Sequence, residues 1–150
     1  FEGMSDPTNY DTRYLDNKFA KDILSTHSKK EKNDFNFWCY ANLEEVKENL
    51  GTYESNKIKL IKGKVEDTLL LKKNLPKKIS ILRLDTDFYE STKIELEILY
   101  PLLSNKGILI IDDYGYWHGA KKAVDEYFKN KNIFLQYIDH DCRLLIKNND

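Results

Sequence analysis

The sequence predicts an α/β fold built around a parallel pair of strands and ending in an antiparallel hairpin. Two short runs, residues 79–84 and 108–111, are rich in Ile and Leu and lack the polar alternation of a strand with one solvated face. Such runs are typical of parallel strands that are covered on both faces. Between them, Ile94, Ile98 and Leu102 recur every four residues, as apolar side chains do along one face of a helix. The stretch therefore predicts one βαβ unit within a mostly parallel sheet.

Polar residues mark the ends of this central helix. Ser91 or Thr92 can cap its start, and Thr92 and Glu95 have the spacing of a capping box. The Asn-Lys-Gly run at 105–107 is a turn signal. We therefore expect the second strand to begin after this turn.

Aspartates follow both strands of the unit. A right-handed crossover brings the carboxyl ends of two parallel strands to the same edge of the sheet, where open α/β folds bind their ligands. Asp85 follows the first strand, and Asp112 and Asp113 follow the second. Because neighbouring strands lie roughly 4.8 Å apart, the three carboxylates could converge on one hard cation. The alternative is that these residues, together with Asp87, only cap the helix and open a turn.

Weaker patterns flank the unit on both sides. Residues 42–49 carry one apolar face behind an Asn and a Glu at capping-box spacing, which predicts a helix packed on the sheet. Residues 58–65 alternate well enough to predict a further strand. Apolar residues at helical spacing from 120 to 128 predict an amphipathic helix. Residues 133–138 and 144–146 predict the antiparallel hairpin.

Residues 5–36 are polar and show no sustained apolar period. We interpret this region as a loop with one helical turn near residues 19–24. Long loops inside compact domains are often lids or binding loops, and the aromatic side chains of this one favour a lid that orders when substrate binds. The alternative is plain disorder.

Composition fits a single domain over residues 1–150, with 41% hydrophobic residues and a formal net charge of −1. Charges of both signs are scattered along the chain, so we expect neither nucleic acid nor a membrane surface as a partner. No apolar run approaches the roughly 20 residues of a membrane helix, and none resembles a signal peptide, which makes the cytoplasm the default location. Cys39 and Cys142 stand far apart and predict two reduced thiols.

The longest motifs carry a family resemblance. The run LRLDTDFYEST, followed by LYPLL, GILIIDDYGYW and GAKKAVDEYF, strongly resembles the macrocin O-methyltransferase family, whose members methylate hydroxyls on sugars of macrolides and related natural products. The similarity extends upstream to GKVEDTL, LEEVKENL and FEGM and covers most of the chain. It implies a Rossmann-like class I methyltransferase sheet, S-adenosylmethionine as methyl donor, a magnesium ion and a small, sugar-like hydroxylated acceptor. Family members tend to form homo-oligomers.

The resemblance also implies roles for particular residues. Asp85, Asp112 and Asp113 would hold the metal, and Asp85 would accept the proton of the acceptor hydroxyl. Asp87 would be a backup ligand or a helix cap. From the sequence alone, the acid at position 66 fits equally well as a helix N-terminal acid favoured by the dipole. The cofactor contacts that the resemblance implies are Phe1, Val65 and Glu66.

Aromatic residues follow the second pair of aspartates. We expect them to rim the acceptor pocket, since aromatic rims suit sugars, or else to cover the edge of the sheet. His140, in the turn of the hairpin, is interpreted as a solvated residue rather than a proton relay. The aromatic rim residues are Tyr114, Tyr116, Trp117 and His118.

The glycine-rich strand-to-helix turn of a cofactor-binding fold does not occur, because the six glycines are isolated from one another. In the family, the acid that holds the cofactor ribose precedes the FEGM motif, which here starts at Phe1. We therefore interpret the chain as the C-terminal part of the methyltransferase domain, lacking its N-terminal strand and glycine turn. In this interpretation it binds S-adenosylmethionine poorly and tends to aggregate or to pair with another copy.

Two other functions stay open. A non-catalytic, methyltransferase-like scaffold would also do without the glycine turn. A magnesium-dependent phosphohydrolase could use Asp85 and Asp87 as an aspartyl phosphatase does, although Tyr89 stands where such enzymes usually carry Thr or Val.

Overall fold

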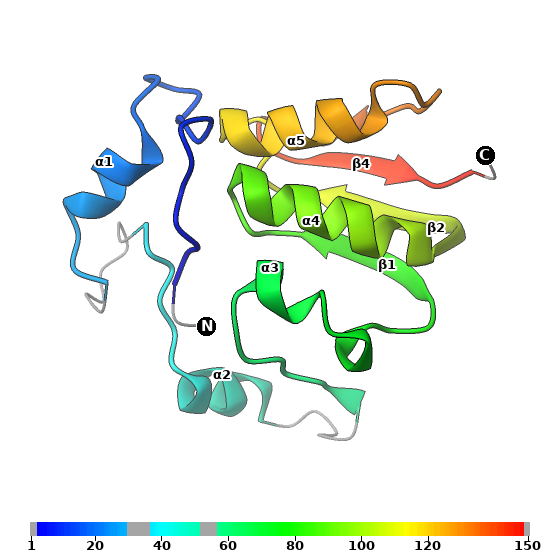
Figure 1. Cartoon of the computed structure of the whole chain (residues 1–150), viewed down its shortest axis with the longest axis horizontal. Helices are drawn as coiled ribbons and strands as arrows, with labels where there is room; N and C mark the ends of the chain where they lie inside the picture. Colours follow the sequence, from blue (N-terminus) through cyan, green and yellow to red (C-terminus); the bar gives the residue numbers. More distant parts are fainter. Residues whose placement is uncertain (1–2, 30–36, 52–56, 149–150) are drawn as a thin grey trace.

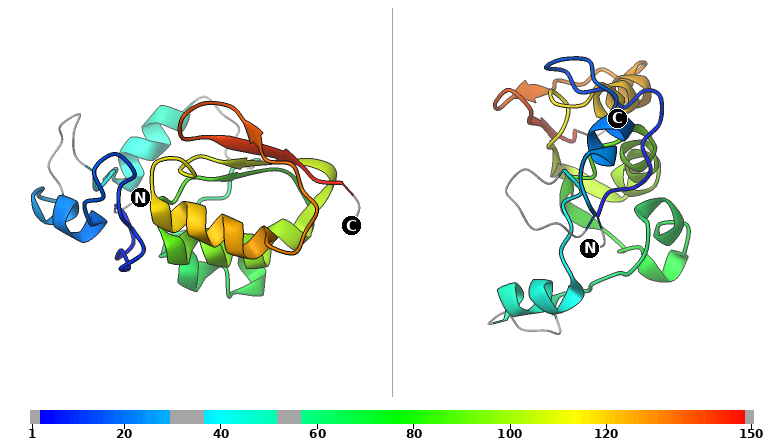
Figure 2. Two further views of the ribbon diagram at one scale, coloured as in Figure 1. Left: turned by 90° about the horizontal axis from the view of Figure 1, so that it is seen from above. Right: turned by 90° about the vertical axis from the view of Figure 1, so that its left-hand side faces the viewer.

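A computed structural model shows a mixed four-stranded sheet that carries two long helices on one face (Figures 1 and 2). The structure describes residues 3–29, 37–51 and 57–148. In chain order the elements are α1 (Ala20–Ser25), α2 (Leu43–Leu50), α3 (Val65–Thr68), η2 (Lys72–Asn74), β1 (Ile79–Leu84), α4 (Tyr89–Leu99), η3 (Tyr100–Leu102), β2 (Leu103–Ile111), α5 (His118–Phe128), β3 (Gln136–Tyr137) and β4 (Arg143–Ile146).

The strand order in the sheet is β1-β2-β4-β3. β1 and β2 are parallel, and their register pairs Leu82 with Leu109 and Leu84 with Ile111. β4 runs antiparallel to both β2 and β3. The βαβ unit, the helix over residues 120–128 and the C-terminal hairpin that the sequence predicts are therefore confirmed.

Apolar side chains fill the space between the sheet and the helices α4 and α5. Each fully buried aliphatic side chain of this kind contributes about 1.5 to 3 kcal/mol relative to an exposed one. This core therefore fixes the position of both parallel strands beneath the two helices. Its fully or almost fully buried members include Leu82, Leu84, Leu96, Leu109, Ile111, Val124, Phe128 and Leu145.

Replacing Leu96 with Ala is expected to lower the free energy of unfolding by about 2 to 5 kcal/mol, because the side chain is completely buried and leaves a cavity. Urea denaturation followed by circular dichroism measures this loss. The matched control is Leu70→Ala, since the Leu70 side chain is 65% exposed and its removal should change stability little. Equal losses for the two variants would contradict the assignment of the core.

The start of α4 differs from the sequence prediction. The helix begins at Tyr89, so Ser91 and Thr92 lie inside its first turns and are buried, and the predicted capping box is wrong. Glu95 turns to the interior instead, where its Oε2 accepts a hydrogen bond from Thr86 Oγ1 (2.8 Å). The helix is capped by a residue far away in sequence, as described below.

The Asn-Lys-Gly run at 105–107 lies within β2 rather than before it. Lys106 adopts a left-handed conformation with φ of 62°, and the register between β1 and β2 is irregular here. The backbone N–H of Lys106 donates to the carbonyl of Lys147 (2.6 Å), and the N–H of Lys147 donates to the carbonyl of Gly107 (2.9 Å). Through these hydrogen bonds, Lys106 and Gly107 pair with Lys147, just after β4. β2 is therefore already paired where the sequence predicts a turn.

The strand predicted over residues 58–65 is wrong. Residues 58–64 form no strand, and Val65 already opens α3. A strand needs a neighbour to receive its backbone hydrogen bonds, and within the described ranges no strand lies beside this segment. The helix α2 forms as predicted, with the side chain of Asn42 accepting from the N–H of Glu45 (2.8 Å), but it buries no residue and lies apart from the sheet (Figure 1).

The N-terminal segment packs against the starts of α4 and α5. Its helix α1 agrees with the helical turn expected near residues 19–24. Residues 30–36 of the expected lid region lie outside the described residues, and the lid itself stays a prediction. A second apolar cluster joins this segment to the rest of the fold, and its buried members are Ala20, Ile23, Leu24, Phe88, Trp117 and Ala120.

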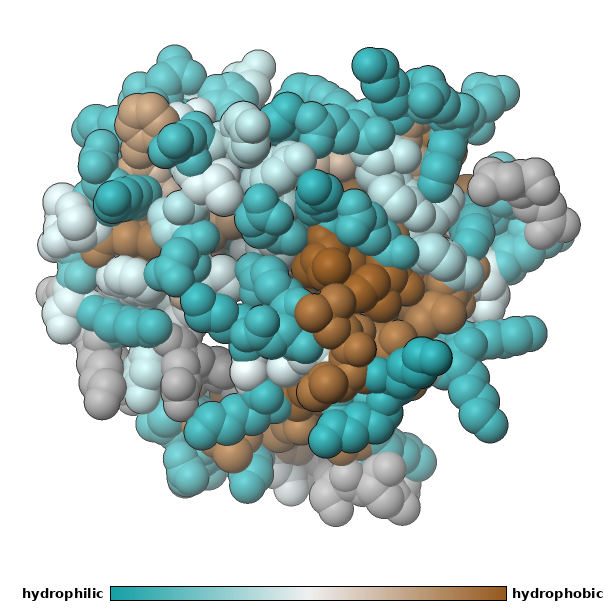
Figure 3. All heavy atoms as spheres, in the orientation of Figure 1, coloured by the Kyte–Doolittle hydropathy of each residue, from teal (hydrophilic) through white to brown (hydrophobic). Residues whose placement is uncertain are grey.

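Apolar side chains gather on the face shown in Figure 3, between α4 and the segment that follows α3. In that segment Leu70 and Leu71 are largely exposed. Exposed apolar patches often mark interaction surfaces, and the homo-oligomer implied by the family resemblance stays a prediction. Cys39 and Cys142 are free thiols, as expected. Across the described ranges, none of the helices has both the length and the apolar character needed to cross a membrane.

Candidate metal and acceptor site

The loops that follow β1 and β2 meet at the carboxyl edge of the sheet. The N–H of Asp112 donates to the carbonyl of Leu84 (3.0 Å), which continues the pairing of the two strands into these loops. The N–H of Asp87 then donates to Oδ2 of Asp113 (3.2 Å) and joins the first loop to the second. The predicted meeting of acidic residues at this edge is therefore present.

Three carboxylates converge here. Asp85, Asp87 and Asp113 each offer one oxygen, and these oxygens lie within 4.8 Å of one another. A set of three carboxylate oxygens suits a hard cation such as magnesium, with ligand distances of about 2.1 Å. The donor chemistry of these residues therefore fits a magnesium ion, which would draw the oxygens closer together.

Asp87 is held in place by unusual local geometry. Its φ of 68° is left-handed, a conformation that Asp tolerates better than most residues. Its Oδ2 accepts a hydrogen bond from the indole Nε1 of Trp117 (3.0 Å), and the Trp117 ring is buried edge-on against Phe88. The carboxylate is thus oriented towards the other acids by a side chain from the second loop.

Burial and mutual repulsion raise the pKa values of these acids. Burial raises the pKa of Asp87 to about 6, and the nearby Asp85 adds to the effect. Burial raises the pKa of Asp113 to about 8, followed by the charges of Asp87 and Asp85. The pKa of Asp85 is also raised, chiefly by burial, with Arg83 opposing the change. A bound cation would relieve this repulsion, since it favours the ionised form of each ligand.

Unlike Asp113, Asp112 is not a member of the cluster of three carboxylates. Its Oδ2 accepts from Arg83 Nη2 (2.9 Å), while Arg83 Nη1 contacts Oδ2 of Asp85 (2.7 Å). The structure thus brings together Asp85 and Asp113 from the predicted ligand set and adds Asp87, which was expected to be a backup ligand or a helix cap. A ligand role for Asp112 stays a prediction.

An open cavity of about 450 Å³ adjoins the acids. Its walls combine aromatic side chains from two segments with the polar turn between β3 and β4. His140 belongs to this wall, and its side chain is 73% exposed, which agrees with the solvated residue that the sequence predicts. Its Nδ1 lies 2.6 Å from Oδ1 of Asp141. The lining residues are Phe37, Asp87, Asp112, Asp113, Tyr116, Asp139, His140, Asp141 and Cys142.

Of the aromatic residues expected to rim the pocket, only Tyr116 lines this cavity. Trp117 is buried behind it. Tyr114 donates its hydroxyl to Asp125 (2.7 Å), and the ring of His118 bonds to Thr12 Oγ1 (2.9 Å). These three side chains serve packing and hydrogen bonding at the sheet edge, which was the alternative interpretation.

The residues expected to contact the cofactor lie at the start of α3. Val65 and Glu66 form its first turn, and Oε2 of Glu66 accepts from Ser5 Oγ (3.1 Å). Lys64 pairs with Asp6 (2.8 Å) beside them. The chain just after the FEGM motif therefore lies against α3. Phe1 lies outside the described residues, and the cofactor contacts stay a prediction.

Glu95 accepts a hydrogen bond from Thr86, in the loop that follows β1, and is expected to make the stability of the fold depend on pH. Burial raises its pKa to about 8, so between the unfolded value near 4.5 and about 8 the folded protein keeps a proton that the unfolded chain loses. Its stabilising contribution is therefore complete below about pH 4.5 and is lost as the pH rises through about 8. Unfolding free energies of the parent and of Glu95→Gln, measured by urea from pH 5 to 9, should diverge in favour of the variant as the pH rises. Parallel curves would contradict a buried, protonated Glu95.

Comparison with known proteins identifies the fold and the family of this chain. The structure superposes on the O-methyltransferase NovP with a TM-score of 0.68 and 28% sequence identity, over 99% of this chain and 57% of NovP. The Rossmann-like methyltransferase fold that the resemblance implies is therefore confirmed. The family model for macrocin-O-methyltransferase (TylF) matches residues 9–145. The chain belongs to this family.

Two curated relatives are similar over part of their length. A demethyldecarbamoylnovobiocin O-methyltransferase of Streptomyces niveus is 39% identical over 65% of this chain and 37% of its own. An 8-demethyl-8-(2,3-dimethoxy-alpha-L-rhamnosyl)-tetracenomycin-C 4'-O-methyltransferase of Streptomyces olivaceus is 38% identical over 57% of this chain and 32% of its own. The matched stretches thus span only about a third of these relatives.

Proposed function

We propose that this chain, a partial methyltransferase domain over residues 1–150, forms the metal- and acceptor-binding edge of an O-methyltransferase that uses S-adenosylmethionine and magnesium. The observation that carries the proposal is the convergence of Asp85, Asp87 and Asp113 beside an open cavity with an aromatic wall. Family membership supplies the reaction class. The acceptor is proposed to be a sugar hydroxyl, because one relative is named for methylating a rhamnosyl-bearing compound.

The acids have distinct roles in this proposal. Asp87 and Asp113 are the more buried pair and would hold the magnesium ion together with Asp85. When bound, the ion supplies Lewis-acid stabilisation of a developing alkoxide. The Asp85 side chain is 46% exposed, so a carboxylate oxygen remains open towards solvent and can accept the proton of the acceptor hydroxyl.

The cavity walls would orient the acceptor. Phe37 and Tyr116 offer aromatic surfaces against which a sugar ring can pack. The turn that contains His140 lines the same cavity and offers donors and acceptors for the remaining hydroxyls. On the cofactor side, Val65 and Glu66 are proposed to face the adenine of S-adenosylmethionine.

Calorimetry and a transfer assay test the proposal together. Magnesium chloride is titrated into the protein with and without methyl α-L-rhamnoside, whose vicinal hydroxyls can share a metal, and we expect binding that the diol strengthens. In an enzyme that joins this chain to a cofactor-binding segment, transfer of a labelled methyl group from S-adenosylmethionine to the rhamnoside should depend on magnesium and stop with EDTA. Magnesium binding without transfer would favour the scaffold, and phosphate release from p-nitrophenyl phosphate would favour the phosphohydrolase. Absence of magnesium binding would contradict the proposal.

A further inference from the structure

A buried carboxylate outside the acid cluster joins the N-terminal segment to the start of α4, just after the loop that follows β1. We call the loops that follow β1 and β2 the first and second acid loops. Asp11 is completely buried. Its Oδ1 accepts from the backbone N–H of Tyr89 (2.7 Å), and its Oδ2 accepts from the N–H (2.6 Å) and hydroxyl (2.9 Å) of Thr8. Tyr89 is the first residue of α4, so Asp11 caps this helix from 78 positions away in sequence. A helix N-terminus favours a carboxylate at this place.

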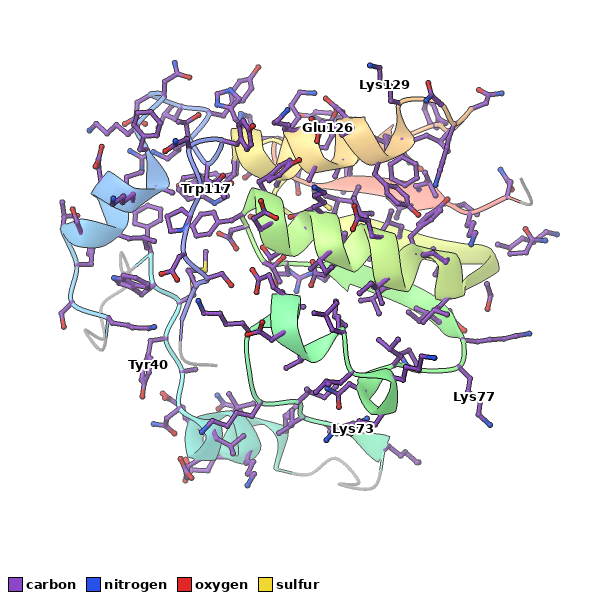
Figure 4. All side chains as sticks on the ribbon, viewed as in Figure 1. Tyr40, Lys73, Lys77, Trp117, Glu126 and Lys129 are labelled. Atoms are coloured by element: carbon purple, nitrogen blue, oxygen red, sulfur yellow. The ribbon has the colours of Figure 1, made fainter. Side chains whose placement is uncertain are left out.

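The same segment pairs with the second acid loop. We call residues 8–14 the N-terminal strap. The N–H of His118 donates to the carbonyl of Thr12 (2.9 Å), and the N–H of Tyr14 donates to the carbonyl of Tyr116 (2.8 Å). A β-bridge joins Arg13 to Trp117 between these bonds. Figure 4 shows Trp117 where the strap passes the starts of α4 and α5.

The contact between Asp11 and α5 leaves no spare room. A Cβ atom built at Gly119 would overlap Oδ1 of Asp11 and approach the N–H of Tyr89 to 3.1 Å. Glycine at this position thus lets α5, Asp11 and the start of α4 meet at one point. Since interiors are close-packed, a shift of Asp11 must move at least one of these elements.

Both acid loops end at this meeting point. Tyr89 lies two positions after the metal-cluster member Asp87, whose carboxylate is held by Trp117 (3.0 Å). Trp117 in turn belongs to the stretch that pairs with the strap. The strap therefore touches the chain just beyond the first loop and just beyond the second.

We propose that Asp11 is a positioning residue for the metal site: by fixing the start of α4 against residues 116–118, it sets the spacing between Asp87 and Asp113. The inference rests on the proposed function, because it assumes that these acids bind magnesium. Asp11 itself does not touch the metal or the acceptor. Its effect on binding is transmitted through Tyr89 and Trp117.

A purely structural role for Asp11 makes a different prediction. If it only stabilises the fold, its replacement lowers the melting temperature but leaves the magnesium affinity of folded molecules unchanged. If it positions the acids, affinity falls even where every molecule is folded. Replacement of residues that orient metal ligands typically weakens metal binding by about 10- to 100-fold.

The test compares magnesium dissociation constants by calorimetry at a temperature below the melting transition of every variant. Asp11→Asn keeps an oxygen for the N–H of Tyr89 but turns an amide donor towards the N–H of Thr8, and we expect its affinity to fall about tenfold or more. Thr8→Val removes the hydroxyl bond to Asp11 (2.9 Å) together with the bond that this hydroxyl accepts from the N–H of Tyr10 (3.1 Å), and we expect a smaller fall. The matched control is Asp22→Asn, an exposed carboxylate on α1, which should bind as the parent does.

Each outcome is decisive. Weaker binding in both strap variants, with parental binding in Asp22→Asn, supports the inference. A lower melting temperature with parental affinity overturns it and leaves the proposed function intact. Absence of magnesium binding by the parent overturns the proposed function and this inference with it. If Asp11→Asn does not fold, Thr8→Val decides the question, and parental affinity in that variant counts against a positioning role.

Discussion

Replacing Asp113 with Asn is expected to lower the affinity for magnesium by about 100-fold, because calcium and magnesium sites tune affinity through the number of charged oxygen ligands. Among the three acids, Asp113 is expected to contribute most to the magnesium affinity. It joins the two loops through its bond to the N–H of Asp87 (3.2 Å), a bond that Asn can retain, so the variant changes charge more than shape. Isothermal titration calorimetry of the parent and the variant measures the loss.

The magnesium affinity that this titration measures should depend on pH. Since burial raises the pKa of Asp113 to about 8 and that of Asp87 to about 6, protons compete with the metal below these values. Affinity of the parent should therefore rise as the pH is raised from about 6 to about 8, with protons released on binding. The Asp113→Asn variant should lose the upper part of this rise. Asp125→Asn, an exposed acid on α5 that pairs with Lys121, is the control and should behave as the parent. Parental affinity in Asp113→Asn would exclude it as a ligand.

The central elements could be predicted because burial alone decides them. Leu82 and Leu109 are neighbours across the parallel pair and are buried under the helices, as their apolar runs predict. The expectation that both faces of these strands are covered is wrong for β1, because Ile81, on its other face, is 64% exposed. The helix α5 was predictable for a related reason, since Ala120, Val124 and Phe128 are buried on one stripe. In both cases the pattern of apolar residues along a short stretch of sequence is enough to predict the element.

Other features depend on partners that sequence spacing does not reveal. The cap of α4 comes from Asp11, so the local pair Thr92 and Glu95 was a misleading signal. Residues 58–64 alternate as a strand does, yet they have no described strand beside them and remain irregular. Propensity is a weak guide where long-range pairing decides the conformation.

The candidate site was predictable in part. Asp85 and Asp113 could be placed because parallel strands end at one edge. Asp87 joins them only through a left-handed φ and the indole of Trp117, and neither is visible in an Asp-x-Asp motif. His140 reaches the cavity wall because the hairpin turn folds against Gly115, whose N–H donates to the carbonyl of Asp141 (2.9 Å). Such a contact follows from tertiary packing and not from local pattern.

In an enzyme that joins this chain to a cofactor-binding segment, replacing Asp85 with Asn should lower the turnover of magnesium-dependent methyl transfer by about 100-fold or more, the usual loss when a general base is removed. Among the three clustered acids, Asp85 combines an exposed side chain with a neighbouring cation, Arg83 Nη1 at 2.7 Å, which favours its ionised form against the effect of burial. It can therefore take up a proton from a hydroxyl bound in front of it, whereas Asp87 is committed to the indole of Trp117. Initial rates are measured over a range of magnesium concentrations, with Asp125→Asn again as control. A base cannot be replaced by more metal, so saturating magnesium should leave the deficit in place, and full recovery of the rate would show that Asp85 acts only as a ligand.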